Sequence, residues 1–300
     1  MIRKMLKKMT GKAASGTQPS NAGGFRTSIS DDMVYPDFCG KAAHDSRLFA
    51  QFRARPEYTR ILEHVPTDLG LLYLQEIPES SRAFQHLREA SKNDLIGSPH
   101  TMVLDSGLKI SPTTLRYVKV SYDLEVLFGD LEGFRVCEIG VGYGGQCRIM
   151  DSLFNIDSYT LVDLRPVLEL AERFLDHFPL RCQVTYRTMN ELGRDQEFDL
   201  ILSNYSFTEL TRVVQEVFLA KVIQHSHRGY ITYNEISPPE FRSMTRDAIR
   251  ERVMAEILDE RPLTSPKNCL IVWGHKKLGS QGTARGHGSS SVHLDLREGH

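Results

Sequence analysis

A glycine-rich stretch is the strongest chemical signal in this sequence. Residues 138–146 read Glu-Ile-Gly-Val-Gly-Tyr-Gly-Gly-Gln. Glycine adopts backbone angles that a Cβ forbids, and it lets a ligand approach the main chain closely. The N-terminus of a helix that follows such a turn favours an anionic group. Because Gly140, Gly142 and Gly145 also fit the dinucleotide pattern G-x-G-x-x-G, the loop predicts a nucleotide or nucleoside site and leaves NAD(P) open.

Two acidic residues near this loop indicate the kind of cofactor. Glu138 favours S-adenosylmethionine, and Asp163 indicates a nucleoside. Glu138 stands two residues before Gly140, where its carboxylate would repel a pyrophosphate but would suit the cationic methionine part of a sulfonium cofactor. Asp163 follows Gly140 by 23 residues, and an acid at this point can accept hydrogen bonds from both hydroxyls of a ribose. NAD enzymes place an acid at the same point, so Asp163 indicates a nucleoside without saying which one.

Polar and acidic residues further along the chain are candidates for binding and activating an acceptor. The segment 203–207, Ser-Asn-Tyr-Ser-Phe, is expected to hold the methionine end of the cofactor and the acceptor. A hydroxyl is a poor nucleophile at neutral pH, so a general base is needed. Glu209 and Glu235 are the candidates, although Glu209 could instead cap the helix that follows it. No histidine or acidic cluster has metal-ligand spacing, and no metal is predicted.

The elements that position these residues alternate in type after residue 131. Helical stripes separate short apolar runs, and strands are predicted at residues 134–139, 159–162, 182–186, 198–202, 229–233 and 268–273. A helix is predicted near residues 240–258. This alternation indicates a mainly parallel, Rossmann-like α/β sheet with helices on both faces. Its ligand should lie beyond the carboxyl ends of the strands, where the loops 138–146, 163–165 and 203–209 fall.

The region before the sheet is predicted to be helical. Across residues 40–130, apolar residues follow helical spacing, as in Tyr58, Ile61, Leu62 and Val65, and Ser111-Pro112 is a typical helix start. We expect this region to form the acceptor side of the site or a lid over it. The α/β domain is expected to cover residues 131–277. Residues 1–30 and 278–300 are poor in core-forming side chains and are predicted to be disordered tails.

Composition bounds the class of protein. Apolar residues make up 40% of the chain and charged residues 25%, and the net charge of −1 gives no reason to expect nucleic acid as a partner. The basic run at residues 1–9 is too short for a membrane anchor and is expected to be solvated. No window approaches the roughly 20 apolar residues of a membrane span. Five widely spaced cysteines suggest free thiols and a cytoplasmic location.

At these residues the chain resembles the sugar O-methyltransferase family of bacterial, S-adenosylmethionine-dependent class I methyltransferases. The similarity extends over about residues 45–275 and rests on the segments 93–99, 110–117, 138–146, 161–164 and 203–210. It implies a class I fold whose last strand is antiparallel, and a sugar, nucleotide-sugar or glycan acceptor, as in polysaccharide biosynthesis. The implied cofactor-binding residues are Glu138, Gly140, Gly142, Tyr143, Gly144, Gly145, Asp163, Leu164, Asn204 and Tyr205.

The same resemblance places Arg116 and Tyr117 at the acceptor. The chain departs from the family pattern at Val141, where a small residue is expected. Two other functions stay open from the residues alone. One is an NAD(P)-dependent Rossmann oxidoreductase, and the other is a non-catalytic scaffold that keeps the methyltransferase fold within a glycan assembly.

Overall fold

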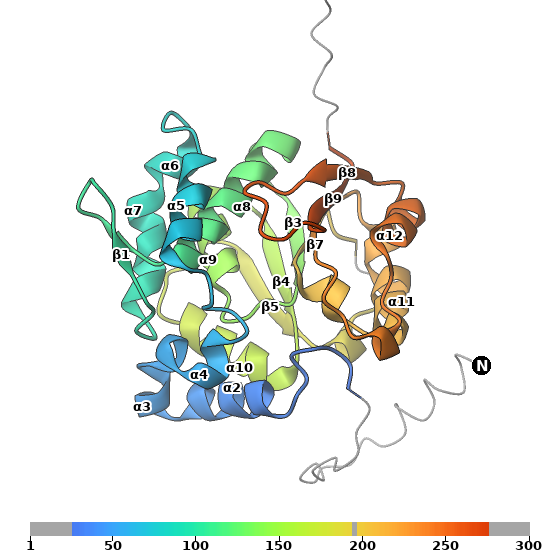
Figure 1. Ribbon diagram of the computed structural model, residues 1–300, viewed down its shortest axis with the longest axis horizontal. Helices are drawn as coiled ribbons and strands as arrows, with labels where there is room; N and C mark the ends of the chain where they lie inside the picture. Colours follow the sequence, from blue (N-terminus) through green and yellow to red (C-terminus); the bar gives the residue numbers. More distant parts are fainter. Residues whose placement is uncertain (1–25, 194–196, 276–300) are drawn as a thin grey trace, which may run out of the picture.

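A seven-stranded sheet forms the centre of the computed structural model, which describes residues 26–193 and 197–275 (Figure 1). Its strand order is β5-β4-β3-β6-β7-β9-β8, and β9 runs antiparallel to both of its neighbours while the other pairs are parallel. The strands are β3 (Arg135–Ile139), β4 (Ser158–Val162), β5 (Gln183–Arg187), β6 (Leu200–Asn204), β7 (Arg228–Tyr233), β8 (Glu256–Asp259) and β9 (Cys269–Trp273). The predicted Rossmann-like α/β class is therefore confirmed.

The C-terminal part of the sheet differs from the prediction in one element. The helix predicted near residues 240–258 is shorter, because α12 (Arg246–Val253) ends where Met254 takes a left-handed conformation with φ 52°. Residues 256–259 then form the edge strand β8, which the sequence reasoning missed. The segment is short and only partly buried, so it lacked the apolar run that identified the other strands.

The sheet separates two hydrophobic cores. Alternate residues of a strand point to opposite faces, so Val136 of β3 belongs to one core and Cys137 to the other. The first core includes apolar residues of α8 (Pro112–Phe128), α9 (Gly145–Leu153) and α10 (Arg165–Leu175). The second includes residues of α11 (Arg212–Lys221) and α12. In Figure 1, α11 and α12 lie on the opposite side of the molecule from the N-terminal helices.

The N-terminal region is helical, as predicted, but most of its helices are short. They are α2 (Val34–His44), α3 (Ser46–Phe49), η1 (Phe52–Ala54), α4 (Pro56–Thr59), α5 (Thr67–Gln75), α6 (Arg82–Gln85), α7 (Leu87–Ala90) and η2 (Ser91–Leu95). A small hairpin of β1 (Met102–Val103) and β2 (Lys109–Ile110) follows. Helix α2 packs on α10, and α5 packs on α8. The N-terminal helices thus share the first core with the sheet.

Local sequence explains where two of these helices begin. The Ser111 hydroxyl accepts a hydrogen bond from the Thr114 N–H at 3.0 Å, and Pro112 occupies the first turn of α8, as predicted. The apolar stripe at residues 58–65 forms no single helix, because α4 ends at Thr59 and Pro66 is the N-cap of α5. In the described part of the chain, no helix is long and apolar enough to span a membrane.

The first described residues overlap with the N-terminal tail that the sequence predicted to be disordered. Residues 26–30 lie inside the range expected to be disordered, yet Ser28 forms an isolated β-bridge with Leu210. The Thr27 carbonyl accepts a hydrogen bond from the Thr211 N–H at 2.9 Å. The remainder of the N-terminal tail and the tail at 278–300 lie outside the described residues, as do the last two residues of the expected α/β domain.

Candidate functional site

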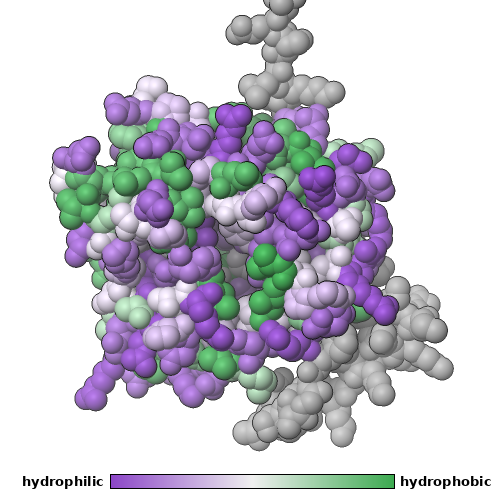
Figure 2. Space-filling model, viewed as in Figure 1, coloured by the Kyte–Doolittle hydropathy of each residue, from purple (hydrophilic) through white to green (hydrophobic). Residues whose placement is uncertain are grey.

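A cavity of about 440 Å³ opens at the carboxyl ends of β3, β4 and β6. The face drawn in Figure 2 is hollowed near its centre. Ligands of open α/β sheets bind at this edge, and pockets of about 300–1,000 Å³ commonly hold small molecules. Seven of the predicted site residues line the cavity: Arg116, Gly140, Gly142, Asp163, Asn204, Tyr205 and Glu209. The predicted loops 138–146, 163–165 and 203–209 therefore meet there.

Gly140, Gly142 and Asp163 form what we call the β3–β4 side of the cavity. The Asp163 carboxylate accepts hydrogen bonds from the Val141 N–H at 2.9 Å and from the Leu164 N–H at 2.7 Å. Burial raises the pKa of Asp163 to about 6, although these backbone N–H groups act in the opposite direction. A carboxylate has about four acceptor positions, so Asp163 positions the loop and keeps lone pairs for a ligand.

Two of the loop glycines are required by both backbone and space. Gly140 has φ +80°, and a Cβ there would lie 2.0 Å from the Ser206 hydroxyl oxygen. Gly142 has φ +55°, and its Cβ would lie 2.6 Å from a methyl group of Leu62. Leu62 belongs to the N-terminal region, which therefore covers the loop at close range. Any side chain at either position would displace the wall of the cavity.

The other half of the glycine loop faces the protein core. Gly144 is the N-cap of α9, and a Cβ on Gly145 would lie 2.5 Å from the hydroxyl oxygen of Tyr143. Tyr143 is fully buried, and its ring packs against Phe174 with centroids 4.7 Å apart. The cavity lining includes none of these three loop residues, nor Leu164. In this structure Tyr143, Gly144 and Gly145 shape the loop and the core that it packs on, and their contact with a cofactor stays a prediction.

Glu138 also lies away from the cavity. Its side chain is on the same face of β3 as Val136, because strand residues alternate, and its carboxylate accepts a hydrogen bond from the Tyr159 hydroxyl at 2.8 Å. Glu138 is 2% exposed and does not line the cavity. Burial raises its pKa to about 8. Glu138 is thus placed outside the cavity lining, and its predicted role toward the cofactor, directly or through water, stays a prediction.

Tyr117 also lies outside the cavity lining. It is buried on α8, its ring lies 6.0 Å from that of Tyr143, and its carbonyl accepts a hydrogen bond from the Gln146 side chain at 3.2 Å. The lining of the cavity includes its neighbour Arg116 and not Tyr117. Of the two predicted acceptor residues, only Arg116 reaches the cavity.

Arg116, Asn204, Tyr205, Glu209 and Asn234 form what we call the β6–β7 side of the cavity. The Glu209 carboxylate accepts a hydrogen bond from the Asn234 amide at 2.7 Å. Burial raises the pKa of Glu209, and the bond from Asn234 acts in the opposite direction. The arrangement resembles that of a general base held in place by an amide.

The two predicted bases have different positions. Asn234 and Glu235 are consecutive beyond the end of β7, and only Asn234 turns into the cavity. Glu235 is exposed and forms an ion pair with the Lys267 ammonium at 2.6 Å. Glu209 and Asn234 therefore line the cavity and Glu235 does not, and the sequence reasoning had not selected Asn234. The catalytic roles of Glu209 and Glu235 stay predictions.

The sequence reasoning missed the residues that the flanking segments contribute to the cavity. From the N-terminal region these include Arg60, His64 and Tyr73, and from the segment before β9 they are Thr264, Ser265 and Asn268. The antiparallel last strand was the signal for the second group. Because β9 is reversed, its beginning lies at the edge where the parallel strands end.

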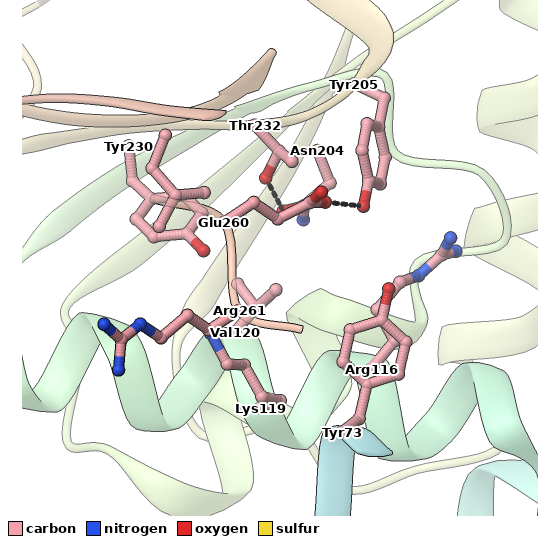
Figure 3. Close-up of a pocket in the computed structure, with 11 residues that line it drawn as sticks. Tyr73, Arg116, Lys119, Val120, Asn204, Tyr205, Tyr230, Thr232, Glu260 and Arg261 are labelled. Carbon is pink, nitrogen blue, oxygen red and sulfur yellow. Dashed lines mark hydrogen bonds between the residues drawn. The ribbon is translucent and has the colours of Figure 1, made fainter. Parts of the chain in front are cut away.

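A pocket of about 20 Å³ adjoins the cavity on the β6–β7 side, and the two share Tyr73, Arg116, Asn204 and Tyr205 (Figure 3). The Tyr205 hydroxyl donates a hydrogen bond to Glu260 there. The other oxygen of Glu260 accepts bonds from the N–H and the hydroxyl of Thr264, at 2.9 and 2.7 Å. Glu260 therefore fixes both Tyr205 and the segment before β9.

A buried polar network attaches the N-terminal region to the glycine loop. The fully buried Arg53 forms ion pairs with Glu63 at 2.6 Å and Asp94 at 3.0 Å, and its guanidinium lies 4.4 Å from the ring centroid of Tyr143. The Asn93 amide donates a hydrogen bond to the Gly145 carbonyl at 3.0 Å. The segments 93–99 and 110–117 carried part of the family resemblance. Asn93 of the first segment supports the glycine loop, whereas Arg116 of the second lines the cavity.

The described residues include no group of three or more histidine, cysteine or acidic side chains that could hold a metal ion.

The fold is Rossmann-like and of the class I methyltransferase type. It is defined by the strand order, by the antiparallel β9, and by the glycine loop with Asp163 at the carboxyl edge of the sheet. This is the fold that the sequence resemblance implied.

Solved structures that are similar to this protein have low sequence identity to it. No protein-family profile and no curated protein sequence matches the chain. A similar solved structure from Galdieria sulphuraria, assigned as a sarcosine dimethylglycine methyltransferase, is 19% identical with a TM-score of 0.35. That alignment covers 41% of this chain and 46% of the other, so the chain spans less than half of that protein.

Two further solved structures are similar over different lengths. An S-adenosylmethionine-dependent methyltransferase from Aquifex aeolicus is 14% identical with a TM-score of 0.38, over 69% of this chain and 97% of its own. Phosphoethanolamine N-methyltransferase 2 from Haemonchus contortus, in complex with S-adenosylmethionine, is 20% identical with a TM-score of 0.36. The latter alignment covers 46% of this chain and 37% of that protein.

Proposed function

We propose that this chain is an S-adenosylmethionine-dependent methyltransferase that acts on a hydroxyl group of a sugar, nucleotide sugar or glycan. One observation carries the proposal: Asp163 and the glycine loop line the same cavity as the buried pair of Glu209 and Asn234. A nucleoside site and a general base therefore share one space at the carboxyl edge of the sheet.

The β3–β4 side favours a nucleoside without a pyrophosphate. Val141 donates its backbone N–H to Asp163, and the start of α9 lies under the fully buried Tyr143. The Gly140 N–H donates to the Val162 carbonyl at 2.9 Å and the Gly144 N–H to the Val141 carbonyl at 3.0 Å, so these loop N–H groups are already paired and are not offered to a phosphate. The free lone pairs of Asp163 suit ribose hydroxyls. The cofactor, when bound, supplies an electrophilic methyl group on a sulfonium.

The β6–β7 side supports a polyhydroxylated acceptor. Hydroxyl and amide side chains line it, among them Asn204, Asn234, Thr264, Ser265 and Asn268. Glu209 would accept the proton of the acceptor hydroxyl as the oxygen forms its bond to the methyl carbon and the carbon–sulfur bond breaks. Alignment of the two reactants in a closed site is worth roughly 7–11 kcal/mol in favourable systems. The acceptor class itself rests on the family resemblance.

The test combines binding with transfer. Titration calorimetry should show binding of S-adenosylmethionine and no binding of NADH. A screen of nucleotide sugars and oligosaccharides with methyl-labelled cofactor should then show label on the acceptor. Tight NADH binding with no heat from S-adenosylmethionine would overturn the proposal. Cofactor binding without transfer to any acceptor, in a protein whose Asp163→Ala variant still supports glycan assembly, would favour the scaffold hypothesis.

A further inference from the structure

The guanidinium of Arg116 is buried in the wall of the cavity without a counter-ion. Only 7% of the residue is exposed, and its Nε atom is buried with no hydrogen-bond partner. Within residues 26–193 and 197–275, none of its guanidinium nitrogen atoms forms a hydrogen bond or an ion pair. The rings of Tyr117 and Tyr205 lie 5.5 and 5.9 Å away, which stabilises a cation but adds no negative charge.

The acidic groups around Arg116 already have other partners. Glu63 pairs with Arg53, Glu209 accepts a hydrogen bond from Asn234, and Glu260 accepts bonds from Tyr205 and Thr264. Figure 3 shows the head of Arg116 turned away from Glu260 and from the small pocket. Because Arg116 also lines the large cavity, its unpaired charge faces the space where a ligand would lie.

Two other buried cations show what is missing at Arg116. Arg53 has two acidic partners, and Lys119, one turn further along α8, pairs with Asp123 at 2.7 Å. A buried charge is normally paired, because removal from water is costly without compensation. Arginine stays protonated in proteins, so Arg116 cannot escape this cost by losing its charge. A ligand is the remaining source of a negative group.

We propose that Arg116 binds a carboxylate of a molecule held in the cavity. The planar guanidinium donates two parallel hydrogen bonds that match a carboxylate. This inference rests on the proposed function, within which two molecules carry such a group. One is the methionine end of S-adenosylmethionine, and the other is an acidic acceptor such as a uronic acid.

Binding measurements distinguish the two sources. The variants are Arg116→Met, which keeps an apolar side chain of similar length, and Arg88→Met, which changes an exposed arginine of α7 outside the cavity. The ligands are S-adenosylmethionine and 5′-methylthioadenosine, which lacks the amino-acid end. If the cofactor supplies the carboxylate, Arg116→Met weakens S-adenosylmethionine binding by about 10- to 100-fold and leaves methylthioadenosine unchanged.

If the acceptor supplies the carboxylate, both affinities stay unchanged. The KM for a uronate acceptor then rises by a similar factor, whereas the KM for the corresponding neutral sugar does not. Arg88→Met should change none of these values. Either pattern supports the proposal, and an Arg116→Met protein that binds both nucleosides and both acceptors like wild type contradicts it.

Thermal denaturation tests Arg116 without relying on methyl transfer. Removing an unpaired buried charge should raise the Tm of the ligand-free protein in Arg116→Met and not in Arg88→Met. If the acceptor supplies the carboxylate, D-glucuronate at high concentration should raise the Tm of wild type more than D-glucose does, and this difference should vanish in Arg116→Met. If wild type binds no S-adenosylmethionine, the proposed function fails while this assay still decides the carboxylate site. A lower Tm together with an unchanged glucuronate response would show a purely structural arginine.

Discussion

The two sides of the cavity differ in how their polar groups are satisfied. On the β3–β4 side, Asp163 accepts hydrogen bonds from the Val141 N–H of the glycine loop and from the Leu164 N–H, so its charge is compensated by the backbone before a ligand binds. On the β6–β7 side, the described part of the chain provides no counter-ion for Arg116 and no hydrogen-bond partner for the buried amide nitrogen of Asn204. Buried polar groups are normally paired.

This difference indicates a division of labour between the two sides. A wall that is satisfied by its own backbone is preorganised, and it suits a ligand that is the same in every turnover. A wall with unpaired donors gains most from the one ligand that supplies their partners, which is a source of selectivity. Substitutions on each side of the cavity can therefore be tested separately.

Replacement of Glu209 should have the largest effect, on the β6–β7 side. Glu209→Gln keeps the size of the side chain but removes the group that would accept the acceptor proton. We expect kcat to fall by about 10²- to 10⁴-fold, with an unchanged Kd for S-adenosylmethionine. Glu235→Gln is the matched control, since its carboxylate pairs with Lys267 outside the cavity. Equal kinetics for the two variants would remove Glu209 from the mechanism.

Replacement of Asp163 should break the β3–β4 side. Asp163→Ala removes the acceptor of two loop N–H groups together with the lone pairs offered to a ribose, so the Kd for S-adenosylmethionine should rise by about 100-fold. In wild type, affinity should also fall as pH drops through about 6, because burial raises the pKa of Asp163 to that value. Calorimetry measures both effects. The control is Asp157→Ala, an exposed acid beside the opposite end of β4, and an equal loss there would contradict the prediction.

Glu138 should affect stability rather than ligand binding. Burial raises its pKa to about 8, so between about pH 4.5 and 8 the unfolded chain loses this proton while the folded protein retains it. Stability therefore falls as pH rises through that window, by roughly 1.4 kcal/mol per unit of pKa difference at most. Glu138→Gln should remove this loss and stabilise the protein at pH 8 but not at pH 4.5. Denaturant unfolding at both pH values, with the exposed Glu132→Gln as control, would detect it; parallel profiles would refute it.

The sequence predicted the sheet and one side of the cavity well. Strands such as β3 and β6 are nearly all buried because both faces of the sheet are covered, and their short apolar runs are recognisable from the sequence. Gly140, Gly142 and Asp163 were identified because turns and strand ends restrict residue type. That Glu138 would not line the cavity could not be predicted, because a motif fixes the position of a residue in sequence but not the face to which its side chain points.

The other side depended on contacts that have no local signature. Asn234 and Glu235 are adjacent in sequence, and only the path of the chain after β7 decides which one turns inward. Tyr73 and Asn268 reach the cavity from segments almost 200 residues apart. Tyr143 looks like part of a binding loop, yet tertiary packing against Phe174 draws it into the core. Such outcomes depend on long-range packing rather than on spacing.

The buried Arg53 network limits how this chain can be shortened. Arg53 and Asn93 precede the sheet in sequence, yet the Arg53 guanidinium packs on the Tyr143 ring and the Asn93 amide binds the Gly145 carbonyl. The hydrophobic core on that face of the sheet includes residues from Tyr35 to Val272. A fragment that started at residue 131 would retain every strand of the seven-stranded sheet but would open an aromatic core to water. The helical segment and the sheet share that core, so truncation between them should destabilise the sheet.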